Sequence, residues 1–372
     1  MRVVVAGNMG YVGSVLTQYL AVHRPDWTIE GVDTAWFGAD LVPGSTLPER
    51  AVTRQWFADL RDLPMEVLAG ADAVVNLAAV SNDPMGREFE AVTEEINRDA
   101  GLRLAAAARD AGVPSFIFAS SCSTYGKGDD RPRTEESPLN PLTAYARSKV
   151  ESEIALRRLA GPSFFVTCLR FATACGFSPR VRLDLVLNDF VASALSAERI
   201  ELLSDGTPWR PVVAVTDMAR AIHWAISERR GVGEPFELLN CGADSWNFTV
   251  RELAQRAAAA LGGVPVTVRT GAGPDPRSYR VDFSRFARLS GDLIPGATLE
   301  EVVGELASGL SFLSGAGGHF RESGLVRLNA LRNLVRRGAL GADLRWTSGG
   351  AGRAAIEEGQ VAAGRTALSP GR

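Results

Sequence analysis

The sequence predicts an α/β protein built on a doubly wound parallel sheet, with a smaller region interleaved in it. Three observations lead to this fold class. Short apolar runs alternate with segments of helical spacing, a glycine-rich turn joins the first run to the first helical segment, and the composition (46% hydrophobic, 22% charged) is that of an ordinary globular protein. The 372 residues suffice for one large domain or two small ones.

The expected strands are the apolar runs, which occupy residues 3–6, 28–32, 73–77, 116–119 and 164–169. Helical spacing is clearest over residues 12–22 and 96–111, which lie between those runs. Strands that alternate with helices form a parallel sheet through right-handed crossovers. The near-continuous apolar character of the runs indicates strands that are buried on both faces.

The pattern changes after residue 176, where proline and arginine become frequent. We predict a first domain over residues 1–176, to which 212–240 return, and a smaller region made of 177–211 and 241–314. Residues 315–346 are predicted to form a C-terminal helical extension, and residues 347–372 a flexible tail.

The C-terminal extension contains one amphipathic segment. Its apolar side holds Leu325, Leu328, Leu331, Leu334 and Val335, and its basic residues are Arg327, Arg332, Arg336 and Arg337. A basic amphipathic helix can bind a membrane surface or a partner protein. The simpler interpretation, which we favour, is a terminal helix that docks on its own domain.

Charge and cysteine usage exclude several classes of function. The net charge of -3 gives no electrostatic reason to expect a nucleic-acid partner. The four cysteines and three histidines are scattered, which predicts neither a disulfide framework nor a metal site. The chain begins with an apolar strand and has no long apolar run, so we expect no signal peptide, no membrane contact and a cytoplasmic location.

The glycine-rich turn after the first strand is typical of a dinucleotide site. Gly7 permits the sharp turn, Gly10 allows the backbone to approach a pyrophosphate, and Gly13 allows the helix to pack close to the strand. The pyrophosphate would then lie at a helix N-terminus. Asp33 follows Gly13 by 20 residues, where a carboxylate that binds the adenosine ribose belongs. No arginine occupies residues 34–36, which favours NAD over NADP.

A pair of residues four apart predicts proton-transfer chemistry. Tyr145 and Lys149 would share one face of a helix, and a nearby ammonium favours the phenolate of a tyrosine that acts as a general base. Ser121 follows the apolar run at 116–119, so its hydroxyl should face the crevice at the end of the sheet. There it could bind the same oxygen that Tyr145 deprotonates.

Taken together, these residues resemble the extended short-chain dehydrogenase/reductase family, the NAD-dependent sugar-nucleotide epimerases and dehydratases. The resemblance spans about residues 1–312 and rests on Gly7-x-x-Gly10-x-x-Gly13, Asp33, Asp59-Leu60, Asn76-Leu77-Ala78-Ala79, Ser121 with Tyr125-Gly126, Tyr145-x-x-x-Lys149, Leu169-Arg170, Trp209-Arg210-Pro211 with Asp217, and the stretch 277–282. These motifs occur jointly and in order.

The resemblance implies a Rossmann-type NAD-binding domain, a nucleotide-sugar substrate and a homodimer. It implies that Tyr145 is the catalytic base, that Lys149 lowers its pKa and binds the nicotinamide ribose, and that Ser121 orients the substrate hydroxyl. The implied cofactor contacts are Gly7, Met9, Gly10, Tyr11, Gly13, Asp33, Asp59, Leu60, Leu77, Ala78, Ala79, Asn97, Tyr145 and Lys149. The expected substrate contacts are Ser81, Asn82, Thr173, Arg180, Arg182, Asn188, Arg210 and Arg277.

Two departures from the family pattern bear on the reaction. Relatives that eliminate water from a 4-keto sugar usually carry an Asp-Glu pair where this chain has Cys122 and Ser123, so a conventional 4,6-dehydratase is disfavoured. Cys122 could serve as an acid or base if its pKa were shifted, with Ser123 beside it, or it could be a packing residue. Thr173 stands where many relatives have an asparagine that helps to hold the diphosphate.

The leading hypothesis is therefore a sugar-nucleotide epimerase that transiently oxidises the C4 hydroxyl, because this reaction needs no further acid or base. A second hypothesis is a dehydratase or 4-ketoreductase that passes through the same 4-keto sugar. A third, from another class, is a catalytically silent NAD-binding sensor or scaffold. The joint presence of Ser121, Tyr145 and Lys149 argues against this third hypothesis.

Overall fold

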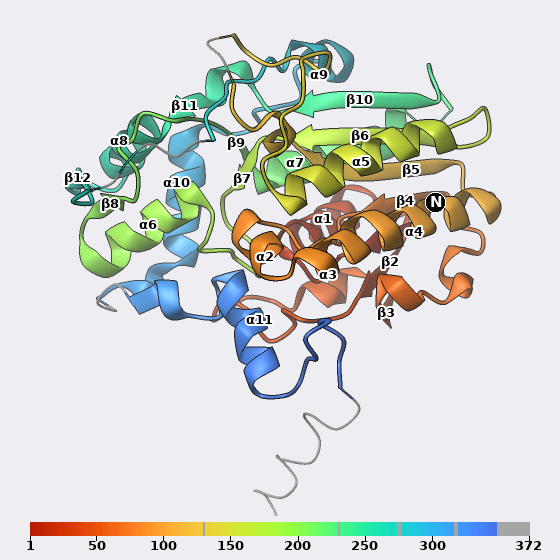
Figure 1. Cartoon of the computed structure of the whole chain (residues 1–372), viewed down its shortest axis with the longest axis horizontal. Coiled ribbons are helices and arrows are strands. Elements are labelled where there is room, and N and C mark those ends of the chain that lie inside the picture. Colours follow the sequence, from red (N-terminus) through yellow and green to blue (C-terminus); the bar gives the residue numbers. More distant parts are fainter. Residues whose placement is uncertain (129–130, 230, 272, 274–276, 316–318, 348–372) are drawn as a thin grey trace, which may run out of the picture.

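The computed structural model describes residues 1–128, 131–229, 231–271, 273, 277–315 and 319–347. Its centre is a seven-stranded sheet in the order β10-β6-β5-β4-β1-β2-β3, and all neighbouring strands in it are parallel (Figure 1). The strands of this sheet are β1 (Arg2–Ala6), β2 (Thr28–Asp33), β3 (Arg54–Phe57), β4 (Ala73–Asn76), β5 (Ser115–Ser121), β6 (Phe165–Phe171) and β10 (Phe236–Cys241). The predicted Rossmann-type α/β fold class is confirmed.

Helices cover both faces of the large sheet, with α1 and α7 on one face and α4 and α5 on the other. The helices of the described residues are α1 (Tyr11–His23), α2 (Asp83–Glu88), α3 (Glu90–Glu94), α4 (Gly101–Asp110), α5 (Ala144–Leu159), α6 (Val186–Ala197), α7 (Val215–Glu228), α8 (Val250–Ala260), α9 (Ser284–Ser290), α10 (Leu299–Gly309) and α11 (Arg327–Arg336). A π-helical turn at Glu95–Ala100 leads directly into α4, so the helix expected over 96–111 is continuous.

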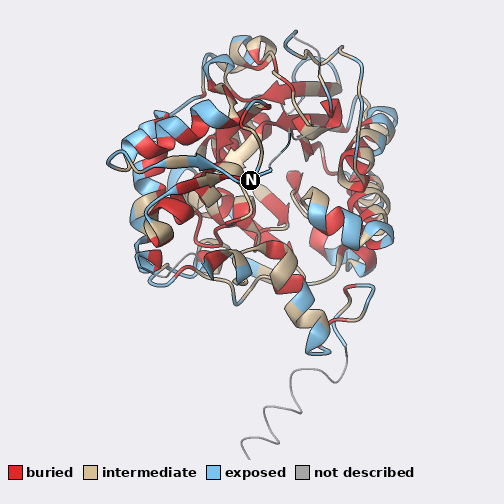
Figure 2. Ribbon diagram, turned by 60° about the vertical axis from the view of Figure 1, so that its left-hand side comes forward, coloured by how far each residue is buried: buried red, intermediate tan, exposed pale blue. Residues whose placement is uncertain are grey.

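Successive side chains of β1 pack into the buried clusters on opposite faces of the large sheet. Val3 and Val5 belong to the same buried cluster as Leu16 of α1 and Ile222 of α7. Val4 of the same strand instead joins the cluster on the other face, to which α4 and α5 contribute. Because successive residues of a strand point to opposite faces, a strand covered on both sides must be apolar throughout. Figure 2 shows buried residues along the strands and exposed residues on the outer sides of the helices.

The two edge strands, β3 and β10, are absent from the apolar runs that predicted the sheet. The sequence of β3, Arg-Gln-Trp-Phe, is only partly buried. In β10 the apolar pattern is interrupted by Glu237 and Asn240, which are buried but have partners: Glu237 pairs with Arg229, and Asn240 accepts a hydrogen bond from the Tyr125 hydroxyl at 2.6 Å. Tertiary partners therefore allow polar residues into a strand that the pattern alone does not reveal.

The smaller region packs against the carboxyl-terminal end of the large sheet. It contains a three-stranded sheet of β7 (Thr173–Cys175), β9 (Trp209–Ala214) and β11 (Asn247–Thr249), and a two-stranded sheet of β8 (Ile200–Leu202) and β12 (Val266–Val268). Helices α6, α8 and α10 share its core. Residues 212–240, which we predicted to return to the first domain, contain α7, and this helix lies beside α1 on the large sheet.

The C-terminal helix α11 docks on the rest of the chain, as we favoured. Leu331 is fully buried in a cluster with Val80, Met85 and Ile96. Of the tail predicted at 347–372, residues 348–372 lie outside the described residues. Within the described part of the chain, the helices are too short or too polar to cross a bilayer.

Candidate active site

A cavity of about 450 Å³ lies at the carboxyl ends of β1, β2, β4 and β5. The strand order reverses between β1 and β4, and ligands of open α/β sheets bind beside such a switch point. The residues that follow these strands supply one wall of the cavity. The smaller region supplies the other wall, through Arg182, Arg210 and Arg277 among others.

The glycine turn forms a cradle that no larger residue would fit. A Cβ atom at Gly7, whose φ is +86°, would lie 2.6 Å from the Ala78 nitrogen, and one at Gly13 would lie 2.2 Å from the Gly7 oxygen. Gly10 begins α1 with no side-chain cap, and the residues from Gly10 to Gly13 line the cavity. A bare helix N-terminus in close reach of the cavity fits the pyrophosphate of a dinucleotide.

Asp33 lies at the end of β2 beside this cradle and lines the cavity. Its carboxylate accepts hydrogen bonds from the backbone N–H of Met9 at 3.0 Å and of Ala35 at 2.8 Å. Burial nevertheless raises the pKa of Asp33. These bonds hold the carboxylate in place for a ribose diol. Met9 does not line the cavity, so its contribution is the N–H that positions Asp33.

The segment after β4 adjoins the glycine cradle, and Leu77, Ala78 and Ala79 line the cavity. Asn97 does not line it. Its side chain instead accepts a hydrogen bond from the Val80 N–H at 2.8 Å and donates one to the Val80 oxygen at 3.0 Å. Asn97 therefore holds the backbone of this segment in place. Any effect that it has on the cofactor is exerted through Val80 and not by direct contact.

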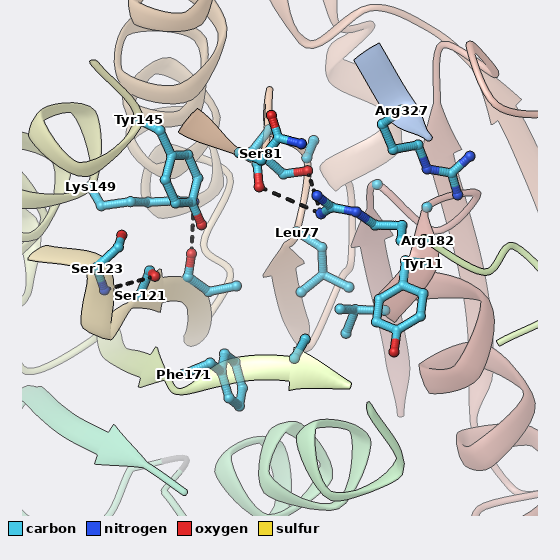
Figure 3. A pocket seen from close by; sticks show the side chains of 18 of the residues that line it. Tyr11, Leu77, Ser81, Ser121, Ser123, Tyr145, Lys149, Phe171, Arg182 and Arg327 are labelled. Atoms are coloured by element: carbon cyan, nitrogen blue, oxygen red, sulfur yellow. Dashed lines mark hydrogen bonds between the residues drawn. The ribbon is translucent and has the colours of Figure 1, made fainter. Parts of the chain in front are cut away.

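Ser121, Tyr145 and Lys149 meet on one side of the cavity (Figure 3). Ser121 ends β5 and accepts a hydrogen bond from the Ser123 N–H at 3.1 Å. Tyr145 lies in the first turn of α5. Thr143 is the N-cap of this helix, and its side chain accepts a hydrogen bond from the Ala146 N–H at 3.2 Å. Lys149 lies one turn further on, and its Nζ donates to the Ala119 oxygen at 2.8 Å.

The charges around Tyr145 differ in part from the expectation. Burial raises the pKa of Tyr145, and the strongest opposing influences are a hydrogen bond with Ser121 and the positive charge of Arg182. The Lys149 Nζ lies 5.6 Å from the centre of the Tyr145 ring. Arg182 is thus a second cation that favours the phenolate, one that the spacing of Tyr145 and Lys149 does not predict.

Burial lowers the pKa of Lys149 to about 8, against an ordinary value of 10.5, and the charge of Glu153 opposes this effect. Between these two pH values Lys149 binds more protons in the unfolded chain than in the folded one, so its own contribution to the free energy of unfolding rises with pH by roughly 3 kcal/mol. The four buried cysteines act in the opposite direction, because burial raises their pKa in the folded chain. The contribution of Lys149 is therefore the difference between wild type and Lys149→Met in urea unfolding, and this difference should change by roughly 3 kcal/mol over the range. Lys127, exposed and the chain's other lysine, provides the control variant Lys127→Met, which should follow the wild type. The same pH dependence in wild type and Lys149→Met would contradict the assignment.

The structure separates Cys122 from Ser123. Cys122 is fully buried outside the cavity, its thiol donates to the Arg170 oxygen at 3.1 Å, and burial raises its pKa. Its burial outside the cavity favours the packing interpretation of Cys122 over an acid or base role. Ser123 lines the cavity, and its hydroxyl is buried without a hydrogen-bond partner among the described residues. Such an unsatisfied hydroxyl suits a polar ligand.

The expected substrate residues Ser81, Asn82 and Arg182 form one network with Asp184 at the cavity wall. Arg182 pairs with Asp184 at 2.8 Å and donates from Nη1 to the Ser81 hydroxyl at 2.9 Å, and Asn82 donates to Asp184 at 2.5 Å. Figure 3 shows Arg182 reaching toward Ser81, between Tyr145 and Tyr11. Thr173, Arg210 and Arg277 also line the cavity.

Two other expected substrate contacts lie outside the cavity. Arg180 is fully buried, pairs with Glu49 at 2.7 Å and donates to the backbone of Phe37 at 3.2 Å. Asn188 is also buried, and its side-chain oxygen accepts a hydrogen bond from the Gly176 backbone N–H at 2.9 Å. Both predictions are corrected: these side chains are committed to protein partners and hold the loops around the site.

Sequence reasoning missed several residues that line the cavity: Trp36, Phe37, Thr143, Tyr279 and Arg327. Asp83 accepts a hydrogen bond from Thr143 at 2.7 Å and pairs with Arg277, which ties α2 to α5 and to the smaller region.

Comparisons with known proteins agree with this geometry. The model of the NAD dependent epimerase/dehydratase family matches residues 3–242. The chain is 28% identical over 296 residues to dTDP-glucose 4,6-dehydratase of Streptomyces griseus (78% of this chain, 88% of that protein) and 28% identical over 295 residues to UDP-glucose 4-epimerase of Corynebacterium glutamicum (74% and 85%). The structure of MoeE5 in complex with UDP-glucuronic acid and NAD matches with a TM-score of 0.71 at 25% identity, covering 83% of this chain and 98% of that one. The chain therefore belongs to the NAD-dependent epimerase/dehydratase family and uses NAD as its cofactor.

Proposed function

We propose that the protein is a nucleoside-diphosphate-sugar 4-epimerase that acts by transient oxidation of the sugar C4 hydroxyl. One observation carries the choice of epimerisation over dehydration. Each carboxylate among the described residues of the cavity already has a partner: Asp184 pairs with Arg182, Asp83 with Arg277, Asp59 with Arg61, and Asp33 binds backbone N–H groups. Tyr145 is thus the best-placed proton acceptor, and 4-epimerisation needs only one.

In the proposed reaction the proton and the hydride of the C4 position are transferred to different groups. Tyr145, as the phenolate, takes the proton of the C4 hydroxyl, and Ser121 holds the same oxygen by a hydrogen bond. The glycine cradle and Asp33 would hold NAD, which would supply the hydride acceptor and donor that oxidation and re-reduction at C4 require. The keto sugar turns in the cavity and presents its other face, and Tyr145 gives the proton back. The inverted hydroxyl is the net result, with no change in the oxidation state of sugar or cofactor.

The substrate class follows from the cations of the smaller region. Arg210 and Arg277 line the cavity on the side away from the glycine cradle, and the planar guanidinium fork suits the diphosphate of a nucleotide sugar. The relatives named above bear names of enzymes that act on dTDP-glucose or UDP-glucose, which supports the same class. Their names do not select one nucleotide or one sugar for this chain.

The test is to incubate the purified protein with UDP- and dTDP-linked glucose, galactose, N-acetylglucosamine and glucuronic acid in deuterium oxide. We expect reversible conversion of at least one of them to its C4 epimer, with unchanged mass and no deuterium bound to carbon, because the hydride that leaves C4 also returns to it. Product analysis by nuclear magnetic resonance and mass spectrometry distinguishes the outcomes. Loss of water with deuterium entering the sugar would instead establish a dehydratase, and a reduced product would establish a ketoreductase.

A further inference from the structure

The C-terminal strap, which we define as residues 319–347, crosses from the smaller region to the dinucleotide-binding edge of the large sheet. It begins on the smaller region, where Arg321 pairs with Asp189 of α6 at 2.8 Å and the Leu325 oxygen accepts from the Leu183 N–H at 3.0 Å. The strap lies beyond residue 242, where the matched family region ends. Figure 1 shows α11 below α2 and α6, followed by a loop that runs beneath the large sheet.

The middle of the strap reaches the cavity itself. Arg327, the first residue of α11, lines the cavity, lies 4.2 Å from the centre of the Phe37 ring and donates to the Arg180 oxygen at 2.7 Å. Phe37 belongs to the loop that follows β2 and Asp33. The strap thus contacts the loop beside the carboxylate that is placed to bind the adenosine ribose.

The end of the strap joins two loops of the dinucleotide site. The Trp346 indole N–H donates to the Thr34 oxygen at 2.6 Å, directly after Asp33. The Asp343 oxygen accepts from Nη1 of Arg61 at 2.8 Å, and the same Arg61 pairs with Asp59 at 2.7 Å. Asp33 and Asp59 end up in one cavity from the separate loops after β2 and β3, and the strap bonds to both loops.

The strap is anchored by apolar packing as well as by these bonds. Leu340 and Leu344 are 2% and 0% exposed, in a cluster with Val80 and Ile96. Val80 follows the wall formed by Ala78 and Ala79, and Ile96 lines the cavity. The burial of these two leucines stabilises the docked end of the strap more than surface hydrogen bonds alone would.

We propose that the C-terminal strap is part of the cofactor site: it holds the loops after β2 and β3 together and thereby preorganises the pocket for the adenosine half of NAD. A loop that must be ordered on binding lowers the affinity, and a loop that is already held does not. The strap therefore strengthens binding of the adenosine half and slows the release of NAD. This inference concerns the cofactor alone and holds whichever sugar reaction the protein performs.

The test compares two shortened chains. One ends at Gly338 and lacks Leu340, Asp343, Leu344 and Trp346. The matched control ends at Thr347 and keeps all of them. Calorimetry measures the dissociation constants of NAD, AMP and nicotinamide mononucleotide, with no sugar nucleotide present. If the two loops are ordered together in only about one molecule in ten without the strap, only that fraction can bind the adenosine half. The affinities for NAD and AMP then fall about tenfold.

We expect the chain that ends at Gly338 to show this loss for NAD and AMP, faster NAD release in stopped-flow experiments, and an unchanged affinity for nicotinamide mononucleotide. The control should match the full chain. Equal affinities for NAD and AMP in both chains would overturn the proposal. If the shorter chain fails to fold, the proposal is tested by the same binding measurements on the Trp346→Ala variant of the full chain. Its side chain is 46% exposed, so the fold should tolerate its loss. A several-fold weaker binding of AMP would support the proposal, and wild-type binding would overturn it.

Discussion

Phenylalanine at position 145 is expected to lower the turnover of the nucleotide sugar by roughly 10²–10⁴-fold, the usual contribution of a general base. The phenyl ring keeps the cavity wall in place, but the oxygen that would take the C4 proton is lost, together with its hydrogen bond to Ser121. NAD should remain bound, since the glycine cradle and Asp33 are untouched. Turnover is measured by product analysis, and NAD content by absorbance after denaturation of the purified variant.

The matched control for this variant is Tyr19→Phe. Tyr19 lies on α1 and stacks on His23 with ring centres 3.9 Å apart, outside the cavity. Its variant should turn over at the wild-type rate. Near-normal turnover by Tyr145→Phe would show that another group takes the proton. A Tyr145→Phe protein that is purified without NAD would show that the substitution acts on binding.

The largest loss of stability is expected from Glu153→Ala, at about 3–5 kcal/mol. Glu153 on α5 pairs with Arg170 on β6 at 2.6 Å, and the side chains of the two are 5% and 2% exposed. The Ser120 hydroxyl donates to the same carboxylate at 2.5 Å. Removing the carboxylate leaves a buried guanidinium whose charge is no longer balanced by its ion pair. Urea unfolding measures the free energy, and the shift should exceed that of most single substitutions.

Glu151→Ala provides the control, since it removes the same residue type from the same helix. Glu151 pairs with Arg98 at 2.9 Å, but its side chain is 49% exposed. Exposed ion pairs contribute at most about 1 kcal/mol, so this variant should unfold almost like the wild type. Similar losses for both variants would mean that burial of the Glu153–Arg170 pair has no special consequence.

Much of the site could be predicted because its parts are local in the sequence. The glycine turn, Asp33 and the Tyr145–Lys149 pair depend on spacings of 3, 20 and 4 residues, and the regular strand–turn–helix geometry carries each spacing into space. The five predicted strands were found for the same reason, since burial on both faces leaves a continuous apolar run. Where burial is partial, as in β3, or where polar groups find distant partners, as in β10, that signal is absent.

The C-terminal strap shows the opposite case. The apolar spacing of Leu328 and Leu331 predicted a helix and a docked face, and both were found. Nothing local indicates the surface on which that face docks. Trp346 bonds to a residue 312 positions earlier in the chain, so the contact depends on how the whole sheet brings its loops together.

Short-range patterns with a physical cause were enough to predict the fold class and the cofactor, both of which are confirmed, and to propose Ser121, Tyr145 and Lys149 as the proton-transfer centre. Which arginines line the cavity depends instead on the fold. Arg180 and Arg182 have the same charge and stand two residues apart, yet Glu49, which is 131 positions away, draws Arg180 into the interior, while Asp184 holds Arg182 at the cavity wall. A buried cation must be paired, and the partner of Arg180 comes from a distant segment that only the folded chain brings close to it.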